Sequence, residues 1–474
     1  MRALFNSLNP KSIAQSLAFY ELYSDRGEGQ EALFRATELL RSQNALDVAK
    51  IAPLVNRYKG IKEELTEEEC LTIERLASFL PNRQLKGYFA KSEEEVLSLP
   101  SYEIDLGKAL ILSQMAGGEK AEIQARHYSA LLDLMALQIL AELPLDATPL
   151  QKITATNYFI FQQMHFRFPP QSIYAQDIDL FTFLPSVMDD HLGVCLGVTA
   201  LYLAIAQRID LPLEIVTPPG HIYVRYGNSG EEINIETTAR GIHVPSETYL
   251  GINTRHLQVR ELKEVVGMTH VNQASVYLHT EKFAQARKSY EKALPYMEGD
   301  ALVTELLAYS CLLTGEEERG VALLKEVVDH TPDFAVAKRV LAEDYLSKKV
   351  DHEGIKAVFI QVDETRESIL KKQERLRVVL DKYPDFRDGL QQMAISYLQL
   401  NRAKEAIQYL RRYHALDAND PAIEYYLSVV HGERHDYKSC WKYLHCAEEI
   451  VHARQFSPRA LRELRKALVL HCPE

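Results

Sequence analysis

The stretch HLGVCLGVTALYLAIAQ, residues 191–207, places Cys195 two residues after Gly193 and directly before an apolar run. The apolar residues of this run recur at helical spacing, which predicts a helix packed into a core. A thiol at a helix start lies near the positive end of the helix dipole and near unpaired backbone N–H groups. These groups stabilise a thiolate and can hold an oxyanion, so Cys195 is a candidate nucleophile. The alternative is a structural thiol, because free cysteine is often buried.

A second stretch, TPPGHIYVRYGNSGEEINIETT at residues 217–238, predicts a β-hairpin whose first strand is headed by His221. If the loop closes symmetrically about Asn228 and Ser229, His221 lies directly opposite Glu236. Opposed side chains on one face of a hairpin are about 5 Å apart at Cβ. An imidazole beside a carboxylate, together with Cys195, would form a triad of nucleophile, base and orienting acid. His221 could also be an ordinary strand-end histidine, and Glu236 one half of a cross-strand pair.

After Gly267 the sequence repeats itself. Small residues recur at a spacing of 34 in two series, which are Ala286, Gly320 and Gly354, then Ala406 and Cys440. This is the register of tetratricopeptide repeats, in which small residues let two antiparallel helices approach. Between the two series, residues 367–384 are 18 additional residues that we expect to lengthen one helix. Residues 457–470 are expected to form the helix that caps the array.

The segments GVCLGVTALYLAIAQRIDLP, PPGHIYVRY and INIETT resemble the transglutaminase-like core, and more closely its SirB1 branch. The resemblance covers roughly residues 100–260. It implies a papain-like fold with Cys195 as nucleophile, His221 as base and Glu236 as orienting acid. The SirB1 branch also implies helices before the core, and tetratricopeptide repeats often follow it.

Two departures from the family pattern concern this site. The family usually has aspartate where this chain has Glu236, which is one methylene longer. Papain-like relatives often carry an amide or indole donor shortly before the cysteine, whereas this chain has Asp189, Asp190 and His191. Among these three only His191 can donate a hydrogen bond, so it is the candidate oxyanion donor.

A zinc site using these residues with Cys195 and His221 is disfavoured, because no short ligand spacing supports it.

The expected fold class is therefore α+β, a transglutaminase-like core preceded by helices and followed by an all-α repeat superhelix. The expected domains are residues 1–97, residues 98–260 and residues 268–474.

A formal charge of −12 with dispersed basic residues argues against nucleic acid as a partner. The N-terminus lacks signal-peptide features and no apolar run reaches about 18 residues, so we expect a cytoplasmic protein without a membrane partner. Six cysteines without a CxxC pair argue against disulfides, and no cofactor or metal is expected.

The repeat register also predicts a concave groove for a protein partner. The residues expected to line it are Leu302, Glu305, Tyr309, Arg339, Glu343, Leu346, Gln391 and Tyr425. This mixed groove favours a partly apolar peptide segment as its ligand. Alternatively, residues 367–384 or the α+β region of the same chain could fill it.

Two functions follow from these patterns. The first is a cysteine hydrolase or acyl transferase that acts on an amide or thioester and recruits a partner through the repeats. The second is a catalytically inactive adaptor that only binds protein partners.

Overall fold

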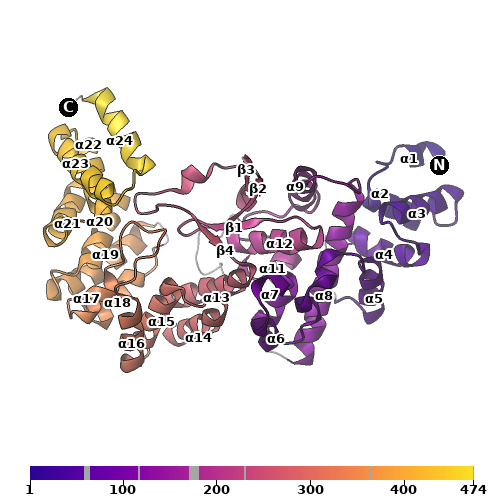
Figure 1. The fold of residues 1–474 in the computed structure, drawn as a ribbon, viewed down its shortest axis with the longest axis horizontal. Helices are drawn as coiled ribbons and strands as arrows, with labels where there is room; N and C mark the ends of the chain where they lie inside the picture. Colours follow the sequence, from indigo (N-terminus) through magenta and orange to yellow (C-terminus); the bar gives the residue numbers. More distant parts are fainter. Residues whose placement is uncertain (58–63, 116–117, 170–180, 229–230, 363–364, 473–474) are drawn as a thin grey trace.

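The structure is a computed structural model that describes residues 1–472 except 58–63, 116–117, 170–180, 229–230 and 363–364. Figure 1 shows an elongated molecule with the N-terminal helices at one end and the C-terminal helices at the other. A small antiparallel sheet lies between them. The architecture is mostly helical, with the sheet in the region predicted to be α+β, so the predicted fold class is confirmed.

The N-terminal region consists of short helices, several of which begin at side-chain caps. Thr66 accepts a hydrogen bond from the backbone of Glu69 and starts α5, and the Glu69 carboxylate accepts one from the backbone N–H of Thr66. Such capping boxes satisfy N–H groups that a helix start leaves unpaired. The helices are α1 (Arg2–Asn6), α2 (Ile13–Leu22), α3 (Gly27–Leu39), α4 (Ala45–Arg57), α5 (Glu67–Leu76), η2 (Pro81–Gln84), η3 (Lys86–Phe89), α6 (Glu93–Ser98) and η4 (Ser101–Glu103).

The helices that follow surround α12 (Cys195–Arg208), the helix that begins at Cys195. Eleven of its residues between Leu196 and Ala206 are buried, as the apolar run predicts. The helices before it are α7 (Leu106–Gln114), α8 (Glu119–Ala141), α9 (Pro149–Asn157), the π-helical segment η5 (Tyr158–Gln163) and α11 (Leu184–Asp190).

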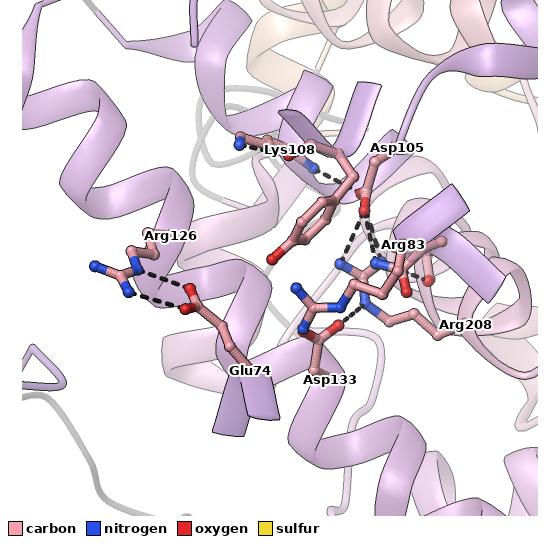
Figure 2. Close-up of polar contacts among 10 residues, drawn as sticks. Glu74, Arg83, Asp105, Lys108, Arg126, Asp133 and Arg208 are labelled. Atoms are coloured by element: carbon pink, nitrogen blue, oxygen red, sulfur yellow. Dashed lines mark hydrogen bonds and ion pairs between the residues drawn. The ribbon is translucent and has the colours of Figure 1, made fainter. Parts of the chain in front are cut away.

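A buried ionic cluster fixes the far end of α12. Arg208, its last residue, is fully buried and lies between Asp105 and Asp133 (Figure 2). Its Nε donates to Asp133 on α8 over 2.8 Å, and its Nη2 donates to Asp105 over 3.3 Å. Asp105 also caps α7, and Asp133 pairs with Arg83. Buried charges of this kind persist only when they are paired, so the cluster ties α12 to α7 and α8.

The sheet has four strands in the order β3, β2, β1, β4, and every neighbouring pair is antiparallel. The strands are β1 (Glu214–Thr217), β2 (Tyr223–Asn228), β3 (Glu231–Ile235) and β4 (Gln258–Arg260). Only the β2 and β3 hairpin is evident in the sequence pattern. Ile222, Val224 and Ile235 are buried in the core that contains α12. The opposite face of the hairpin is therefore the one that carries polar side chains.

The repeats form five helix pairs in the predicted register, and each pair places its small residue on the second helix. The paired helices are α13 (Leu262–His279) and α14 (Phe283–Ala293), α15 (Ala301–Leu313) and α16 (Glu317–Val327), α17 (Leu341–Leu346) and α18 (His352–Phe359), α20 (Arg387–Gln399) and α21 (Ala403–Leu416), α22 (Pro421–Glu433) and α23 (Tyr437–Ala453). A single turn, η9 (Leu294–Tyr296), follows α14, and the terminal helix is α24 (Arg459–His471).

Residues 367–384 do not lengthen a neighbouring helix, so this expectation is corrected. They form most of a separate helix, α19 (Arg366–Lys382), which packs between α18 and α20. Thr365 accepts a hydrogen bond from the backbone of Ser368 and starts this helix independently. The apolar side chains Ile369, Leu376 and Leu380 are buried, which gives α19 a packing face of its own.

Two large apolar cores account for most of the packing. One extends from Ile13 through α12 and the sheet to Val303, so the N-terminal helices, the α+β region and the first repeat share it. The other extends through the repeats from Ala274 to Tyr443. Within the described residues, no helix combines the length and the apolar character that crossing a membrane requires.

Candidate functional site

Cys195 is the first residue of α12, and its side chain is partly buried against the core. The preceding N-cap residue is Val194, and among the described residues no side chain caps this helix start. Valine is a poor N-cap, and replacing a good cap by such a residue typically costs about 1 kcal/mol. The first turn therefore keeps backbone N–H groups beside the thiol that an anion can use.

Gly197 lets this first turn pack closely. A Cβ atom at position 197 would lie 2.3 Å from the carbonyl oxygen of Phe181, which no side chain tolerates. The N–H of Val194 also donates to that carbonyl over 3.0 Å. The residues before α11 thus hold the helix start, and they fix the direction in which the Cys195 side chain leaves it.

His221 and Glu236 meet on the polar face of the hairpin. His221 Nε2 lies 2.6 Å from Glu236 Oε2, and the Cys195 thiol is near enough to raise the pKa of the imidazole. Because Nε2 is committed to the carboxylate, Nδ1 is the ring nitrogen that can take the thiol proton. The three residues predicted to form a site are thus adjacent in the fold, in the order thiol, imidazole, carboxylate.

The hairpin register differs from the symmetric closure that the sequence suggested. Tyr226 pairs with Ile233, and Asn228 pairs with Glu231, so the ladder is shifted by two residues from the expected one. His221 lies before the first residue of β2, and it does not face Glu236 directly in the ladder. A shift of two residues keeps every side chain on its original face, so the two groups still share the polar face.

Two residues that the sequence did not single out hold the Glu236 carboxylate. Thr238 donates to Oε1 from its hydroxyl over 2.6 Å and from its backbone N–H over 3.2 Å. Tyr249 donates its hydroxyl to Oε2 over 2.5 Å. The Tyr249 ring also stacks on His221, with ring centres 5.5 Å apart. Neither residue belongs to a spacing motif, because both reach the carboxylate from the connection between β3 and β4.

The surroundings shift both titrating groups in the direction of an ion pair. Burial alone lowers the pKa of His221, but its interactions with Cys195 and Glu236 outweigh burial and raise this pKa to about 9. Burial alone raises the pKa of Glu236, but hydrogen bonds from His221, Thr238 and Tyr249 lower it to about 2. At neutral pH the site therefore favours a protonated imidazole beside an ionised carboxylate.

The candidate oxyanion donor, His191, lies at the end of α11 in a left-handed conformation, with φ of 54°. Its Nδ1 is 2.8 Å from the carbonyl oxygen of Met164, and its ring stacks on Phe166. A carbonyl only accepts, so the proton of neutral His191 sits on Nδ1. Neutral His191 therefore has no second proton for an oxyanion, and this role stays a prediction that requires the protonated ring.

The neighbouring acids give no support to a zinc site. Asp189 accepts a hydrogen bond from the Tyr128 hydroxyl over 2.9 Å. Among the described residues, no group of three or more His, Cys, Asp or Glu side chains is arranged to hold a metal ion.

The predicted groove residues divide into buried and accessible ones. Glu305 and Tyr309 are buried, and the Tyr309 hydroxyl donates to Glu305 over 2.5 Å. They therefore do not present their side chains to a partner, which corrects the expectation for this pair. Arg339 pairs with Glu305 over 3.2 Å while its own side chain is 56% exposed. The other predicted positions are exposed or half-buried, namely Leu302, Glu343, Leu346, Gln391 and Tyr425.

Comparison with known families supports the two-part organisation. The family described as the transglutaminase-like superfamily matches residues 126–267, and a tetratricopeptide repeat family matches residues 269–294. No curated protein matches the chain.

Two solved structures show some likeness, and each covers less than half of this chain. The thermophilic TPR protein TTC0263 of Thermus thermophilus is 16% identical, covering 43% of this chain and 99% of its own, with a TM-score of 0.23. MamA from Desulfovibrio magneticus is 11% identical, covering 40% of this chain and 96% of its own, with a TM-score of 0.21.

From the two family matches, the chain carries a transglutaminase-like core of the SirB1 type, followed by tetratricopeptide repeats.

Proposed function

We propose that the chain is a cysteine hydrolase or acyl transferase that acts on an amide or thioester bond, with Cys195 as nucleophile. The observation that carries this proposal is the position of His221, which lies 2.6 Å from Glu236 and near enough to Cys195 for the thiol to raise its pKa. A base between a nucleophile and an orienting acid is the arrangement that cysteine acyl transfer requires.

The reaction would begin from the ion pair in which the Cys195 proton already resides on His221. The thiolate attacks the substrate carbonyl carbon, a carbon–sulfur bond forms, and the carbonyl oxygen becomes an oxyanion. The backbone N–H groups at the start of α12 would hold this oxyanion, and the lack of a side-chain cap at Val194 supports this role. Protonated His221 then gives its proton to the leaving amine or thiol as the scissile bond breaks.

The acyl group is released in the second half of the cycle. His221, now neutral, removes a proton from water or from an acceptor amine, which attacks the acyl carbon. Collapse breaks the carbon–sulfur bond and returns the proton to Cys195. Water gives hydrolysis, whereas an amine gives acyl transfer. Throughout, Glu236 holds the imidazole orientation, because Thr238 and Tyr249 fix its carboxylate.

The repeats provide protein-binding capacity, and we propose that they bring a protein substrate or partner segment to the core. The accessible predicted positions, such as Leu302, Arg339 and Leu346, offer apolar and charged contacts to such a segment. We also propose a cytoplasmic setting, because the six cysteines are free thiols, as is usual in reducing compartments.

The alternative is an inactive adaptor that only binds protein partners. The hydrogen bond that commits His191 to Met164 favours it, since neutral His191 then cannot donate to an oxyanion. In that case the transglutaminase-like core would be a scaffold for the repeats.

Alkylation with iodoacetamide across pH, followed by peptide mapping, separates these two functions. An ion-paired Cys195 should be alkylated near pH 6, well below the ordinary thiol pKa of about 8.5. Cys446 is an internal control, because it is also only partly buried and its burial raises its pKa. Modification of Cys195 only after denaturation would contradict the enzymatic proposal and leave the adaptor.

A further inference from the structure

The connection between β3 and β4 links the candidate site to the repeats. Residues 245–256 of this connection, which we call the strap, contain the single turn η8 (Ser246–Tyr249). In Figure 1 the chain leaves the sheet here, extends toward α22 and α24, and then returns to β4. The strap is thus part of the α+β region by sequence, although it reaches the far end of the repeat array.

The distal part of the strap docks on the repeats. Ile252 is 9% exposed and belongs to an apolar cluster with Val336, Ala422 and Trp441. The neighbouring backbone pairs with the segment between α16 and α17. Asn253 accepts a hydrogen bond from the Val336 N–H over 3.0 Å, and the Arg255 N–H donates to Phe334 over 2.8 Å. Thr254 and Ala335 form the antiparallel bridge between these two bonds.

This docking site overlaps the predicted groove. Ala422 lies on the first helix of the last repeat, and Tyr425 packs against the same apolar cluster as Ile252. The chain therefore fills one end of its own groove, which is one of the two occupants the sequence left open. The occupant comes from the α+β region, and α19 instead packs as an additional helix within the array.

The proximal part of the strap lies at the candidate site. Ser246 is held by the Tyr223 hydroxyl at 3.1 Å and by the Asn234 amide at 3.0 Å. Three residues later, Tyr249 donates to Glu236 and stacks on both His221 and Tyr223. Three residues after that, Ile252 enters the apolar cluster. Three residues of extended chain span about 10 Å at most, so Tyr249 lies between two closely spaced anchors.

We propose that Tyr249 is a positioning residue of the Cys195, His221 and Glu236 site, and that docking of the strap on the repeats holds it there. This inference rests on the proposed function, because it names what regulates the same site. Only one of the two anchors lies within the core, and the other is supplied by the repeats. A partner segment that takes the place of Ile252 therefore releases Tyr249 from the carboxylate and the imidazole.

Release of Tyr249 has a defined electrostatic consequence. The hydroxyl pins the Glu236 carboxylate beside His221, and the stacked ring keeps water from the pair. Without them the ion pair is weaker, since attraction between charges falls as water enters. The pKa of His221 then returns from about 9 toward the ordinary value of 6.5. A smaller fraction of Cys195 is then ionised at low pH, because its partner His221 is less often protonated. Cys195 is therefore alkylated more slowly at pH 6.

The test is the pH titration of His221 in the full chain. NMR on protein with labelled histidine measures the protonation of the ring at each pH. The His221 signal is assigned by its loss in His221→Gln. Tyr249→Ala should lower the His221 pKa by about one unit or more, which corresponds to a tenfold change in the protonation equilibrium. Tyr249→Phe keeps the stacked ring and loses only the hydroxyl, so it should give a smaller shift.

Two distant substitutions test the part played by the repeats. Ile252→Asn and Val336→Asn change opposite sides of one apolar contact without adding charge, so each should lower the His221 pKa nearly as much as Tyr249→Ala. Val259→Asn is the matched control, because Val259 on β4 is 55% exposed and pairs with Val216 rather than with a residue of the site. It should leave the titration unchanged. Circular dichroism and protease sensitivity of the strap show whether each variant is folded and whether the strap has undocked.

The outcomes separate the inference from the function it rests on. An unchanged His221 titration in Tyr249→Ala would overturn the positioning role. A shift in Tyr249→Ala with none in Ile252→Asn and Val336→Asn would overturn the link to the repeats. If wild-type Cys195 is unreactive at pH 6, the proposed activity fails. The His221 titration still decides whether the strap controls the site.

Discussion

Cysteine, histidine and an acid lie close together at the start of α12 and also at the start of α23. In the repeats, His431 Nδ1 lies 2.8 Å from Asp436, and Cys440 follows four residues later. In the core, His221 Nε2 lies 2.6 Å from Glu236. The residue types are nearly the same in both regions, so composition alone does not distinguish a candidate site from ordinary packing.

The two helix starts differ in how their unpaired N–H groups are used. Asp436 is itself the N-cap of α23 and accepts a hydrogen bond from Ser439, so its carboxylate neutralises the positive end of that helix. Cys440 is fully buried, and burial raises its pKa. At α12 the N-cap is Val194, and the acid comes from a separate element through a histidine. The comparison predicts that Cys195 is the reactive thiol of the two, because its helix start is open and its charge partner does not occupy that start.

The largest expected effect comes from removing the histidine in each region. His221→Ala should slow alkylation of Cys195 at pH 6 by a few hundredfold, because an ordinary thiol is only about 0.3% ionised there. His431→Ala is the matched control and should leave the Cys195 rate unchanged. The measurement is the second-order rate with iodoacetamide, resolved by peptide mapping. Equal rates in wild type and His221→Ala would remove the distinction between the two regions.

The pH dependence of stability should show a smaller effect. The folded-state pKa of His221, about 9, lies above its ordinary value of 6.5, so proton binding favours the folded state. This stabilisation is complete below pH 6.5 and is lost as the pH rises toward 9. The pKa of Glu236 is lowered to about 2, so its contribution is complete above pH 4.5 and is lost as the pH falls toward 2.

Thermal unfolding of wild type and His221→Ala should therefore differ most between about pH 4.5 and 6.5. The difference in unfolding free energy between wild type and His221→Ala should shrink by at most roughly 3 kcal/mol between pH 6.5 and 9. This limit follows because a shift of one pKa unit corresponds to about 1.4 kcal/mol. Cys195→Ala keeps the pair with Glu236 but loses the contribution of the thiol, so it should retain only part of this dependence. A difference that stays constant from pH 6 to 9 would contradict a raised His221 pKa.

The sequence predicts those features that depend on local periodicity. The apolar run after Cys195 predicts a helix that starts there, and α12 does. The spacing of 34 predicts helix pairs, because each pair is a local unit that repeats. The side chains of His221 and Glu236 share a face even though the ladder is shifted, since only an odd shift exchanges the two faces.

Features that depend on contacts between distant segments could not be predicted in this way. Tyr249 is a polar residue in a connection without periodicity, and only the folded chain brings it to the carboxylate, whereas Thr238 is two residues from Glu236 and makes a local contact. The docking of Ile252 joins residues more than 80 positions apart, and no spacing rule encodes such a contact. The burial of Glu305 and Tyr309 could not be predicted from the repeat register either, because the register gives the direction of a side chain but not what covers it.

The smallest effect that still distinguishes the regions concerns the two acids. Glu236→Gln removes the negative charge beside His221 but keeps a group that can hydrogen-bond. The imidazole should stay near Cys195, while its protonated form loses its partner. Alkylation at pH 6 should therefore slow by about tenfold, which corresponds to one pKa unit of His221.

Asp436→Asn should leave the Cys195 rate unchanged, because that acid caps α23 and asparagine is also a good N-cap. If Glu236→Gln reacts as fast as wild type, hydrogen bonding alone orients His221. The charge of the acid would then be dispensable, and the open start of α12 would be the only feature that sets the core apart from the repeats.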